Sequence, residues 1–553
     1  MIGITSGGFM KSKFCIFCLL LLFTITLTAQ TVHEPNSGIY RDIDTWIIKG
    51  YIKSFPPLIR PYPAQLVINL LNEVVENGDT AARQTALNYL NAVSPESRLL
   101  NPGLLGYVQG NEDDYSLIAG GFLEGLFHIS EALNVSFNFT LYGISDNHGE
   151  RFNVPGTYSP YPDFVLDTSN IGSIQLMQEW TSITAVGTSD IYLQAGLTRT
   201  SVGPFYDNGI IAGPQAPRHG HFSFVYYQLN WTFEILLQAI TATNDFGKKT
   251  VTNKFNILHN IVFRPIDNFE FGFHQSMVFG ERMEFLYLIP FSFLFASESI
   301  YGFSDNALMG LHFRWRPFNN FLVNGQVYVD DFHFNNILKG IFQAKIAGEI
   351  GVSWAPESKY LSRLDFDYTA VFPYTYSHWS LPEVDRYTDA AVNYLNYTHM
   401  GRNIGPDLEP NSDRISLRTY WNIIPSVKLN FSAYFIRHAN ASENRKDAYY
   451  SDNNEENYRD GSVYDDGLFR DPSQDRGSPF LPGFADFLTQ DLIEMYLGGT
   501  LGVYWTLPVN FGTFVFSLDY GVEYGWNRKF EKWIIKDNNG FNHYWSIGAA
   551  FHW

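Results

Sequence analysis

The sequence predicts an all-β transmembrane barrel of about 18 antiparallel strands, preceded by a small periplasmic α-helical region. Three observations support this fold. Apolar and polar residues alternate along most of the chain, short and long connections alternate between the predicted strands, and the last strand ends on an aromatic residue, Trp553. A membrane-spanning strand has one face toward lipid and one toward the lumen, and barrels carry short periplasmic turns and long outer loops. A soluble β-sandwich explains the alternation but not the segregated loops.

Composition excludes two classes of protein. The 553 residues are 45% hydrophobic and 17% aromatic, which is too apolar for a disordered chain. The net charge of −19 argues against binding to a phosphate backbone, so we expect no nucleic-acid partner.

Residues 1–29 have the pattern of a signal peptide. Lys11 and Lys13 precede an apolar run over 14–27, and Thr28 and Ala29 provide a cleavage site. A membrane-anchoring helix is the alternative, but the run is short for the roughly 20 residues that a bilayer span needs. The two cysteines of the chain both lie in this run, so the mature protein has no thiol.

Residues 30–100 form the predicted periplasmic helical region. Ile43, Trp46 and Ile47 recur at helical spacing, and similar patterns cover 67–75 and the stretch after Asp79. The proline-rich stretch 55–63 cannot be helical throughout and predicts a rigid connector.

Residues 101–553 form the predicted outer-membrane barrel. We expect strands near 104–109, 115–129, 132–142, 171–186, 190–198, 221–229, 232–242, 253–263, 269–279, 307–315, 321–329, 341–354, 361–371, 413–421, 427–437, 495–507, 511–524 and 541–553. Long extracellular loops are expected at about 143–170, 199–220, 280–306, 372–412 and 438–494. The alternation alone gives seventeen strands, and the strand 104–109 is added because a barrel with both ends in the periplasm needs an even number.

Charged residues of both signs are expected to face the lumen. They are Arg314, Arg316, Lys345, Glu349, Asp365, Asp367, Arg414, Arg418, Asp519 and Glu523. Such groups more often pair with each other or with a plug than select a solute, and a selective channel is the alternative.

No catalytic motif is present in the sequence, and we expect no enzyme, no cofactor and no metal site. Asp330 and Asp331 are adjacent on a predicted strand, so they face opposite ways and cannot flank one glycosidic bond. An EF-hand over 452–463 lacks its glycine and its distal glutamate.

Several loose motifs together resemble the Wzi capsule-assembly family, over about residues 38–553. They are 41–44 with Gly50, 199–209 through 216–217, 304–310, and 397–406 followed by 411–412. The resemblance implies an outer-membrane barrel with a periplasmic helical portion, and a lectin-like role in organising capsular polysaccharide. The loop 438–494 is longer than that pattern suggests. The helix from Arg41 to Gly50 also faintly resembles a surface-layer homology unit, which is an alternative.

The loop 372–412 combines the residue types that bind sugars. Flat aromatic faces cover apolar C–H groups, while amide, carboxylate and guanidinium groups bond hydroxyls. The predicted glycan-binding residues are Tyr374, Tyr376, Trp379, Tyr387, Tyr394, His399 and Arg402. The alternative is that these aromatic side chains pack the loop against itself or join the interfacial girdle.

We therefore expect a protein of the cell outer membrane that binds or organises surface polysaccharide without catalysis. Its expected partners are the polysaccharide, the lipid bilayer and the outer-membrane assembly machinery, and we expect a monomeric barrel. A porin-like channel for small solutes or oligosaccharides is the alternative.

Overall fold

The structure is a computed structural model. It describes residues 35, 37–93, 100–112, 114–130, 133–145, 164–244, 249–303, 305–332, 344–378, 383–384, 391–392, 394–424, 426–440, 487–530 and 533–553. Among these residues, none of the helices has both the length and the apolar character needed to span a bilayer. The predicted signal peptide and most of the loops 143–170 and 438–494 lie outside the described residues.

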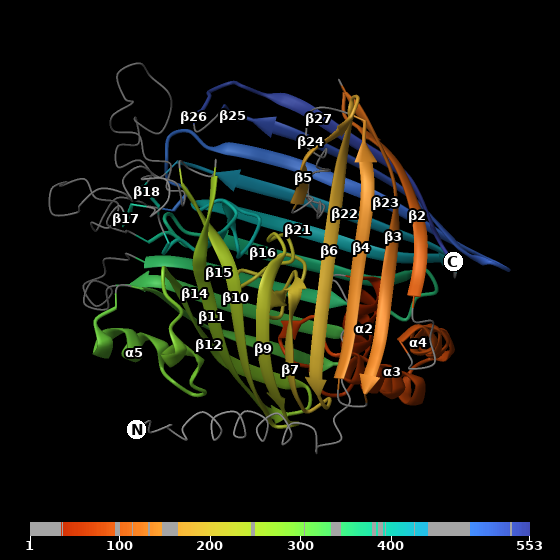
Figure 1. Cartoon of the computed structure of the whole chain (residues 1–553), viewed down its shortest axis with the longest axis horizontal. Coiled ribbons are helices and arrows are strands. Elements are labelled where there is room, and N and C mark those ends of the chain that lie inside the picture. Colours follow the sequence, from red (N-terminus) through yellow and green to blue (C-terminus); the bar gives the residue numbers. More distant parts are fainter. Residues whose placement is uncertain are drawn as a thin grey trace, which may run out of the picture.

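Eighteen of the described strands form one closed antiparallel barrel (Figure 1). In chain order they are β2 (Leu100–Gly110), β3 (Tyr115–Ser130), β4 (Leu133–Ile144), β6 (Ile174–Gly187), β7 (Ile191–Thr198), β9 (His219–Tyr227), β10 (Trp231–Asn244), β11 (Lys249–Ile266), β12 (Phe269–Gly280), β13 (Asn306–Phe318), β14 (Phe321–Phe332), β15 (Ala344–Trp354), β16 (Leu361–Val371), β21 (Ser412–Ile424), β22 (Val427–His438), β23 (Glu494–Val509), β24 (Gly512–Trp526) and β27 (Gly540–His552). Pairing of β2 with β27 closes the ring.

Every predicted strand corresponds to one of these eighteen, so the predicted fold class is confirmed. One difference is β5 (Phe164–Ile171), which pairs with β6 as a hairpin inside the predicted loop 143–170. We call the end of the barrel with tight connections, such as 318–321, the short-turn end. The opposite end is the long-loop end.

Alternation sets the register of each strand. On β27, Phe541, Ile547 and Trp553 face outward and are exposed, while Tyr544 and Ser546 face the lumen beside Gly521 and Asp519 of β24. Other outward apolar side chains, such as Leu311 and Ile350, are also exposed. A closed sheet with an apolar outer face is the form in which strands cross a membrane, because it leaves no unpaired edge in lipid.

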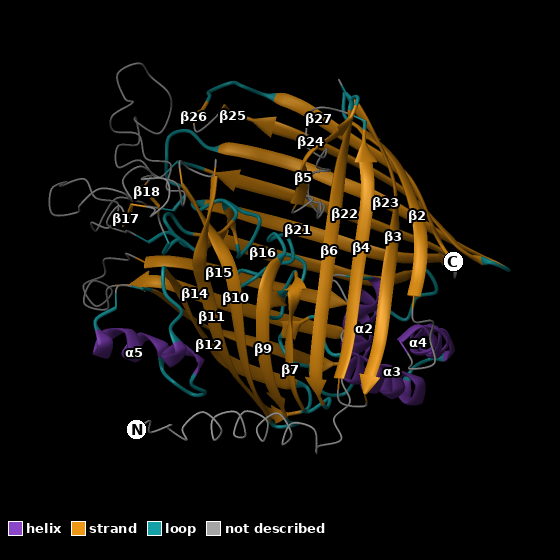
Figure 2. Cartoon of the chain, viewed as in Figure 1, coloured by secondary structure: helices purple, strands orange, loops and turns teal. Residues whose placement is uncertain are grey.

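Three helices lie at the short-turn end (Figure 2). They are α2 (Gly38–Lys49), α3 (Ala64–Asn77) and α4 (Thr80–Val93). Helix α2 ends where Gly50 takes φ 78°, a left-handed conformation that favours glycine. The backbone N–H of Asn320, in a tight turn of the barrel, donates to the Ile48 carbonyl at 2.9 Å. The helical region is therefore attached to the short-turn end of the barrel.

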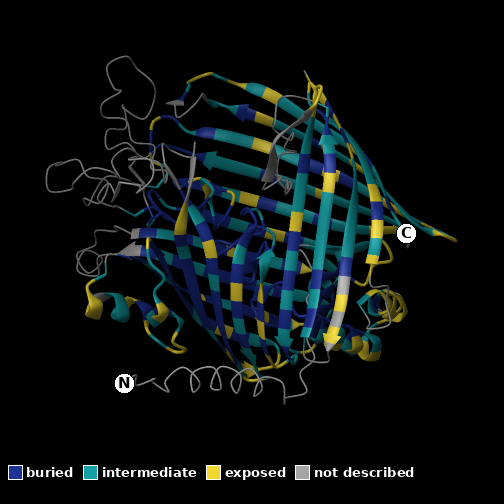
Figure 3. Cartoon of the chain, in the orientation of Figure 1, coloured by how far each residue is buried: buried dark blue, intermediate teal, exposed yellow. Residues whose placement is uncertain are grey.

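The two largest buried clusters contain lumen-facing residues of the wall, and the buried strand positions are dense over β9 to β16 (Figure 3). One cluster joins apolar residues of the helices to lumen-facing Tyr192, Val225 and Leu322 of the wall. The predicted charged lumen positions are inward-facing as expected. Among them, Arg418 pairs with Asp367 and Arg314 pairs with Glu270.

Candidate functional site

Three chain segments enter the lumen and meet there. The first contains the connector with β1 (Ile59–Arg60) and comes from the short-turn end. The second, residues 199–218, contains β8 (Ser201–Val202) and comes from the long-loop end. The two short strands pair antiparallel, with Ile59 opposite Val202. The third is the described part of 372–411, which packs on the second.

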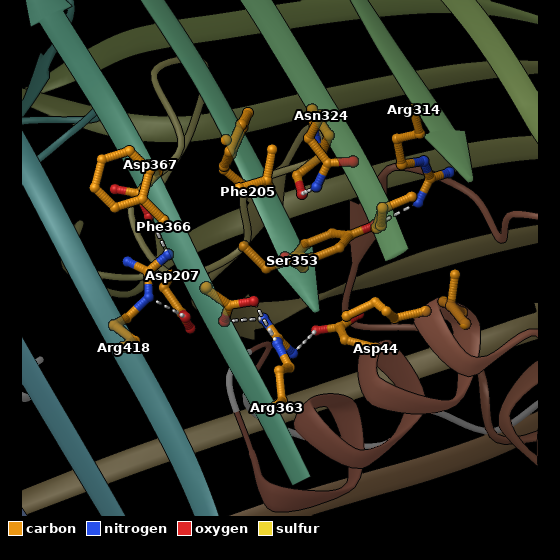
Figure 4. Close-up of a pocket in the computed structure, with 18 residues that line it drawn as sticks. Asp44, Phe205, Asp207, Arg314, Asn324, Ser353, Arg363, Phe366, Asp367 and Arg418 are labelled. Carbon is orange, nitrogen blue, oxygen red and sulfur yellow. Dashed lines mark hydrogen bonds and ion pairs between the residues drawn. The ribbon is translucent and has the colours of Figure 1, made fainter. Parts of the chain in front are cut away.

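Ion pairs fasten the helical region and the second segment, each separately, to the wall of the barrel (Figure 4). Asp44 of α2 pairs with Arg60 and lies 3.8 Å from Arg363 of β16. Asp207, from the second segment, lies 3.7 Å from the Nε of Arg418 on β21. Burial acts to raise the pKa of Asp207, but the nearby arginines lower it below its usual range. A cavity of about 50 Å³ remains between these groups, too small for a sugar.

Three tyrosines pack together inside the barrel, on the long-loop side of this cavity. Tyr328 of β14 packs against Tyr376 and Tyr397, with ring centroids 6.3 and 5.8 Å away. The hydroxyls of Tyr376 and Tyr397 donate to the carbonyls of Ile210 and Ile211 at 2.6 and 2.7 Å. Buried aromatic rings whose hydroxyls are all paired serve to pack the interior.

Asp330 has a structural role in the same place. Its carboxylate accepts the backbone N–H of Tyr376 at 2.8 Å. The side chain therefore holds the third segment against the wall.

The predicted glycan-binding residues fall into three groups. Tyr374, Tyr376, Tyr394 and His399 are buried, Arg402 is exposed, and Trp379 and Tyr387 lie outside the described residues. The expectation that this loop presents its aromatic residues on an outer surface is wrong for the four buried side chains. They fill the lumen because apolar rings gain more free energy from burial than from contact with water. A role in glycan binding stays a prediction for all seven.

His399 shows how the third segment is fastened. Its Nδ1 accepts the backbone N–H of Thr241 at 3.1 Å, so Nε2 carries the proton and donates to the Arg218 carbonyl at 3.0 Å. Burial lowers the pKa of His399 to about 4, and nearby Lys254 and Arg199 act in the same direction. The ring is therefore neutral at physiological pH.

An open pocket of about 660 Å³ lies at the long-loop end, on the other side of the barrel mouth. It is formed by the long-loop ends of five barrel strands (β21, β22, β23, β24 and β27) and by residues of two connections, 407–409 and 528–538. The lining residues are Asp407, Leu408, Glu409, Ser412, Ile436, His438, Glu494, Tyr496, Glu523, Arg528, Lys529, Asn538 and Asn542. This volume is within the range of small-molecule binding sites.

A chain of charged contacts runs across this pocket. His438 lies 3.1 Å from Glu494 and 3.3 Å from Glu409, and Glu409 also pairs with Lys529. Burial acts to raise the pKa of Glu409, but the charges of Lys529 and His438 lower it to about 2. The carboxylate is therefore ionised and is a strong hydrogen-bond acceptor.

The pocket also offers donors and an aromatic side chain. Nη1 of Arg528 donates to Asn542 at 3.1 Å, while its Nε has no partner among the described residues. Tyr496 supplies an aromatic ring beside Ile436 and Leu408. Carboxylates, amides, a guanidinium and a tyrosine ring are the groups that pair with sugar hydroxyls and cover sugar C–H surfaces.

Sequence reasoning missed most of this pocket. Only Glu523 was predicted to face the lumen. A usable signal was present: His438 and Glu494, at the two ends of the predicted loop 438–494, and Asn542, on the last predicted strand, continue the inward alternation of their strands. Within the described residues, no group of three or more histidine, aspartate, glutamate or cysteine side chains is arranged to hold a metal ion.

No protein-family model matches the sequence, and no curated protein matches it. Among solved structures, the chain is similar to Wzi of Escherichia coli, described as an outer-membrane protein involved in group 1 capsule assembly and a carbohydrate-binding β-barrel. The TM-score is 0.55 at 14% identity, over 94% of this chain and 99% of that chain.

Two porins give lower scores. OprD of Pseudomonas aeruginosa has a TM-score of 0.40 at 9% identity, over 82% of this chain and 94% of that chain. OccAB2 of Acinetobacter baumannii has a TM-score of 0.41 at 9% identity, over 82% and 97%. The fold is that of an outer-membrane barrel, and the predicted resemblance to Wzi is confirmed at the level of the fold.

Proposed function

We propose that this protein is an outer-membrane lectin that binds or organises surface polysaccharide at the long-loop end of its barrel, without catalysis. One observation carries the proposal: an open pocket lined by groups that can bind sugars lies at the long-loop end, beside segments packed inside the barrel. The lipid bilayer and the polysaccharide are the partners, and the barrel acts as a monomer after insertion by the assembly machinery.

The pocket chemistry supports a saccharide rather than an apolar ligand. Its lining is dominated by Asp, Glu, Asn, Arg and Lys side chains, and its aromatic contribution is Tyr496. A ligand rich in hydroxyl groups fits such a lining, because its hydroxyls can replace the water that hydrogen-bonds to the polar side chains of the pocket. The description of Wzi as a carbohydrate-binding barrel is in line with this proposal.

A porin-like channel is the second candidate function, and the packing in the lumen weighs against it. A channel needs a continuous aqueous path, whereas the packing of Tyr328, Tyr376 and Tyr397 and the pairing of β1 with β8 occupy part of the interior. The proposal retains Trp379, Tyr387 and Arg402 as further glycan contacts from the loop 372–412.

Binding to a glycan array by the detergent-purified protein tests the proposal. The test variant is Arg528→Ala combined with Asn542→Ala, which removes a donor pair from the pocket. The control is Lys359→Ala, which changes an exposed cation at the short-turn end. We expect the wild type and the control to bind the same glycans, and the pocket variant to lose at least about tenfold in affinity, which corresponds to about 1.4 kcal/mol.

Single-channel conductance in planar bilayers separates the two candidate functions. We expect no steady conductance through the wild-type barrel. A selective open pore in a protein that binds no glycan on the array would replace the lectin proposal with the porin alternative.

A further inference from the structure

The segment between β12 and β13 lies against the outside of the barrel. It contains the short helix η2 (Phe285–Leu288) and helix α5 (Leu294–Tyr301). Figure 1 shows α5 outside the ring of strands, beside β12. We call residues 285–301 the outer flap.

The outer flap covers a part of the wall that would otherwise face lipid. Phe233 on β10 and Met277 and Phe279 on β12 point outward by their register, yet they are fully buried. Phe291 stacks on Phe233 with ring centroids 4.2 Å apart, and Tyr287 packs edge-on against Phe279 at 5.2 Å. The flap is therefore packed onto the wall.

The height of these contacts places the flap beside the membrane-spanning part of the barrel. Gln275, which touches the flap, is six residues from the start of β12 at the short-turn end. At a rise of about 3.4 Å per residue and a strand tilt of about 40°, this corresponds to roughly 15 Å of height. Phe233 is closer still to the short-turn end. The apolar belt of such barrels is about 25 Å tall, so both contacts lie within it.

Gln275 explains how an irregular turn can lie at this depth. Its side-chain amide donates to the Ser292 carbonyl at 2.6 Å and accepts the backbone N–H of Leu294 at 2.9 Å. These two groups belong to the turn between η2 and α5. A polar residue on the outer face of a transmembrane strand is costly, but here it satisfies backbone groups that lipid cannot.

The other face of the flap is apolar and open. Seven large side chains are exposed over 17 residues: Phe285, Ile289, Phe291, Phe293, Phe295, Ile300 and Tyr301. Glu298 is the one charged residue in this stretch of the sequence. This exposed face adjoins the apolar outer surface of β12 and β13, where Phe271 and Leu311 are similarly exposed.

We propose that the outer flap is a lipid-contacting element, with its exposed aromatic and aliphatic face seated among the acyl chains of the bilayer. The flap replaces the covered wall as the surface that meets lipid. Three observations favour acyl chains over water at this face. It continues the apolar outer surface of the neighbouring strands, it lies at the depth of the membrane-spanning wall, and it carries one charged residue. A second copy of the chain or another membrane protein on this face is the competing occupant, which the test distinguishes.

Spin labels on single cysteines test the proposal, because the mature chain has no cysteine of its own. Ile300→Cys and Phe295→Cys place the label on the flap, Leu311→Cys is the lipid-facing control, and Lys359→Cys is the water-facing control. The labelled proteins are reconstituted in phosphatidylcholine vesicles. Collision rates are measured with oxygen, which concentrates in lipid, and with a water-soluble nickel chelate. Heat-modifiable migration on gels shows that each variant is folded.

We expect flap labels to collide with oxygen as often as the Leu311→Cys label, within about twofold, and with the nickel chelate at least about fivefold less often than the Lys359→Cys label. High nickel accessibility at both flap positions would place the flap in water and overturn the proposal. Low accessibility to both reagents would mean that protein covers the flap, and would overturn it equally.

Discussion

Arg316 offers a direct test of how the helical region is fastened in the barrel. From β13, its guanidinium donates to the carbonyls of Ile47, Ile52 and Lys53 at 2.6, 2.8 and 2.6 Å. The side chain is 6% exposed. One residue of the wall thus binds the end of α2 and the chain that follows it. We expect Arg316→Ala to loosen α2 without unfolding the barrel, whose strands pair independently of it.

The size of the effect follows from the three bonds. A hydrogen bond to a charged group contributes about 1.5–3 kcal/mol when its partner would otherwise stay buried. The carbonyls lie close to the short-turn end, where water can replace the lost donor, so we take about 1 kcal/mol for each bond and about 3 kcal/mol in total. That value corresponds to roughly a hundredfold rise in the opening equilibrium of the helical region.

Hydrogen exchange read by mass spectrometry measures this opening. Amides of α2 should exchange roughly a hundredfold faster in Arg316→Ala, while those of β14 and β15 should not change. Arg316→Lys should recover part of the protection, since an ammonium can still donate to one or two of the carbonyls. Unchanged exchange in α2 of a correctly assembled Arg316→Ala barrel would refute the view that this residue anchors the helices.

Three further outcomes are expected. Tyr376→Phe should destabilise the protein by about 1–3 kcal/mol, because it orphans the Ile210 carbonyl; a urea midpoint no lower than that of the exposed control Tyr360→Phe would contradict this. For His399, the folded pKa of about 4 lies below the ordinary 6.5, so the opened loop binds a proton more tightly and docking loses roughly 2 kcal/mol at pH 5 relative to pH 7.5. Hydrogen exchange of residues 394–411, corrected for its intrinsic pH dependence, should be faster at pH 5 than at pH 7.5 in the wild type. An equally large increase in His399→Gln would show that a group other than His399 causes it. Trp553→Asp should impair insertion, seen as loss of the heat-modifiable form, because it places a charge on the outward face of the last strand; normal outer-membrane levels would count against this reading.

The strands could be predicted because their signal is local. In β27, the alternation of Phe541, Ile547 and Trp553 with Tyr544 and Ser546 already contains the register that the structure shows. Tight turns such as 424–427 then fix where one strand ends and the next begins. Each of these signals is complete within about fifteen residues, so no knowledge of the rest of the chain is needed.

The contents of the lumen could not be predicted in the same way. Tyr376 and Tyr397 look in the sequence like aromatic residues of an exposed sugar-binding loop. Whether they are exposed depends on the space left by the helical region and by residues 199–218, which enter from other parts of the chain. The outer flap was likewise expected to be an ordinary external loop, although its apolar run over 285–301 was visible in the sequence.

The antiparallel pairing of β1 with β8 restricts the order in which the barrel can assemble. Both short strands lie within the ring that β2 and β27 close, and they reach each other from opposite ends. β1 precedes every strand of the barrel in the chain, whereas β27 is the last. Because β1 and β8 both precede β27 in the chain, they can pair before the ring closes, and the N-terminal region can then act as a template around which the sheet wraps. If the ring closed first, β1 would have to enter through the short-turn end to reach β8.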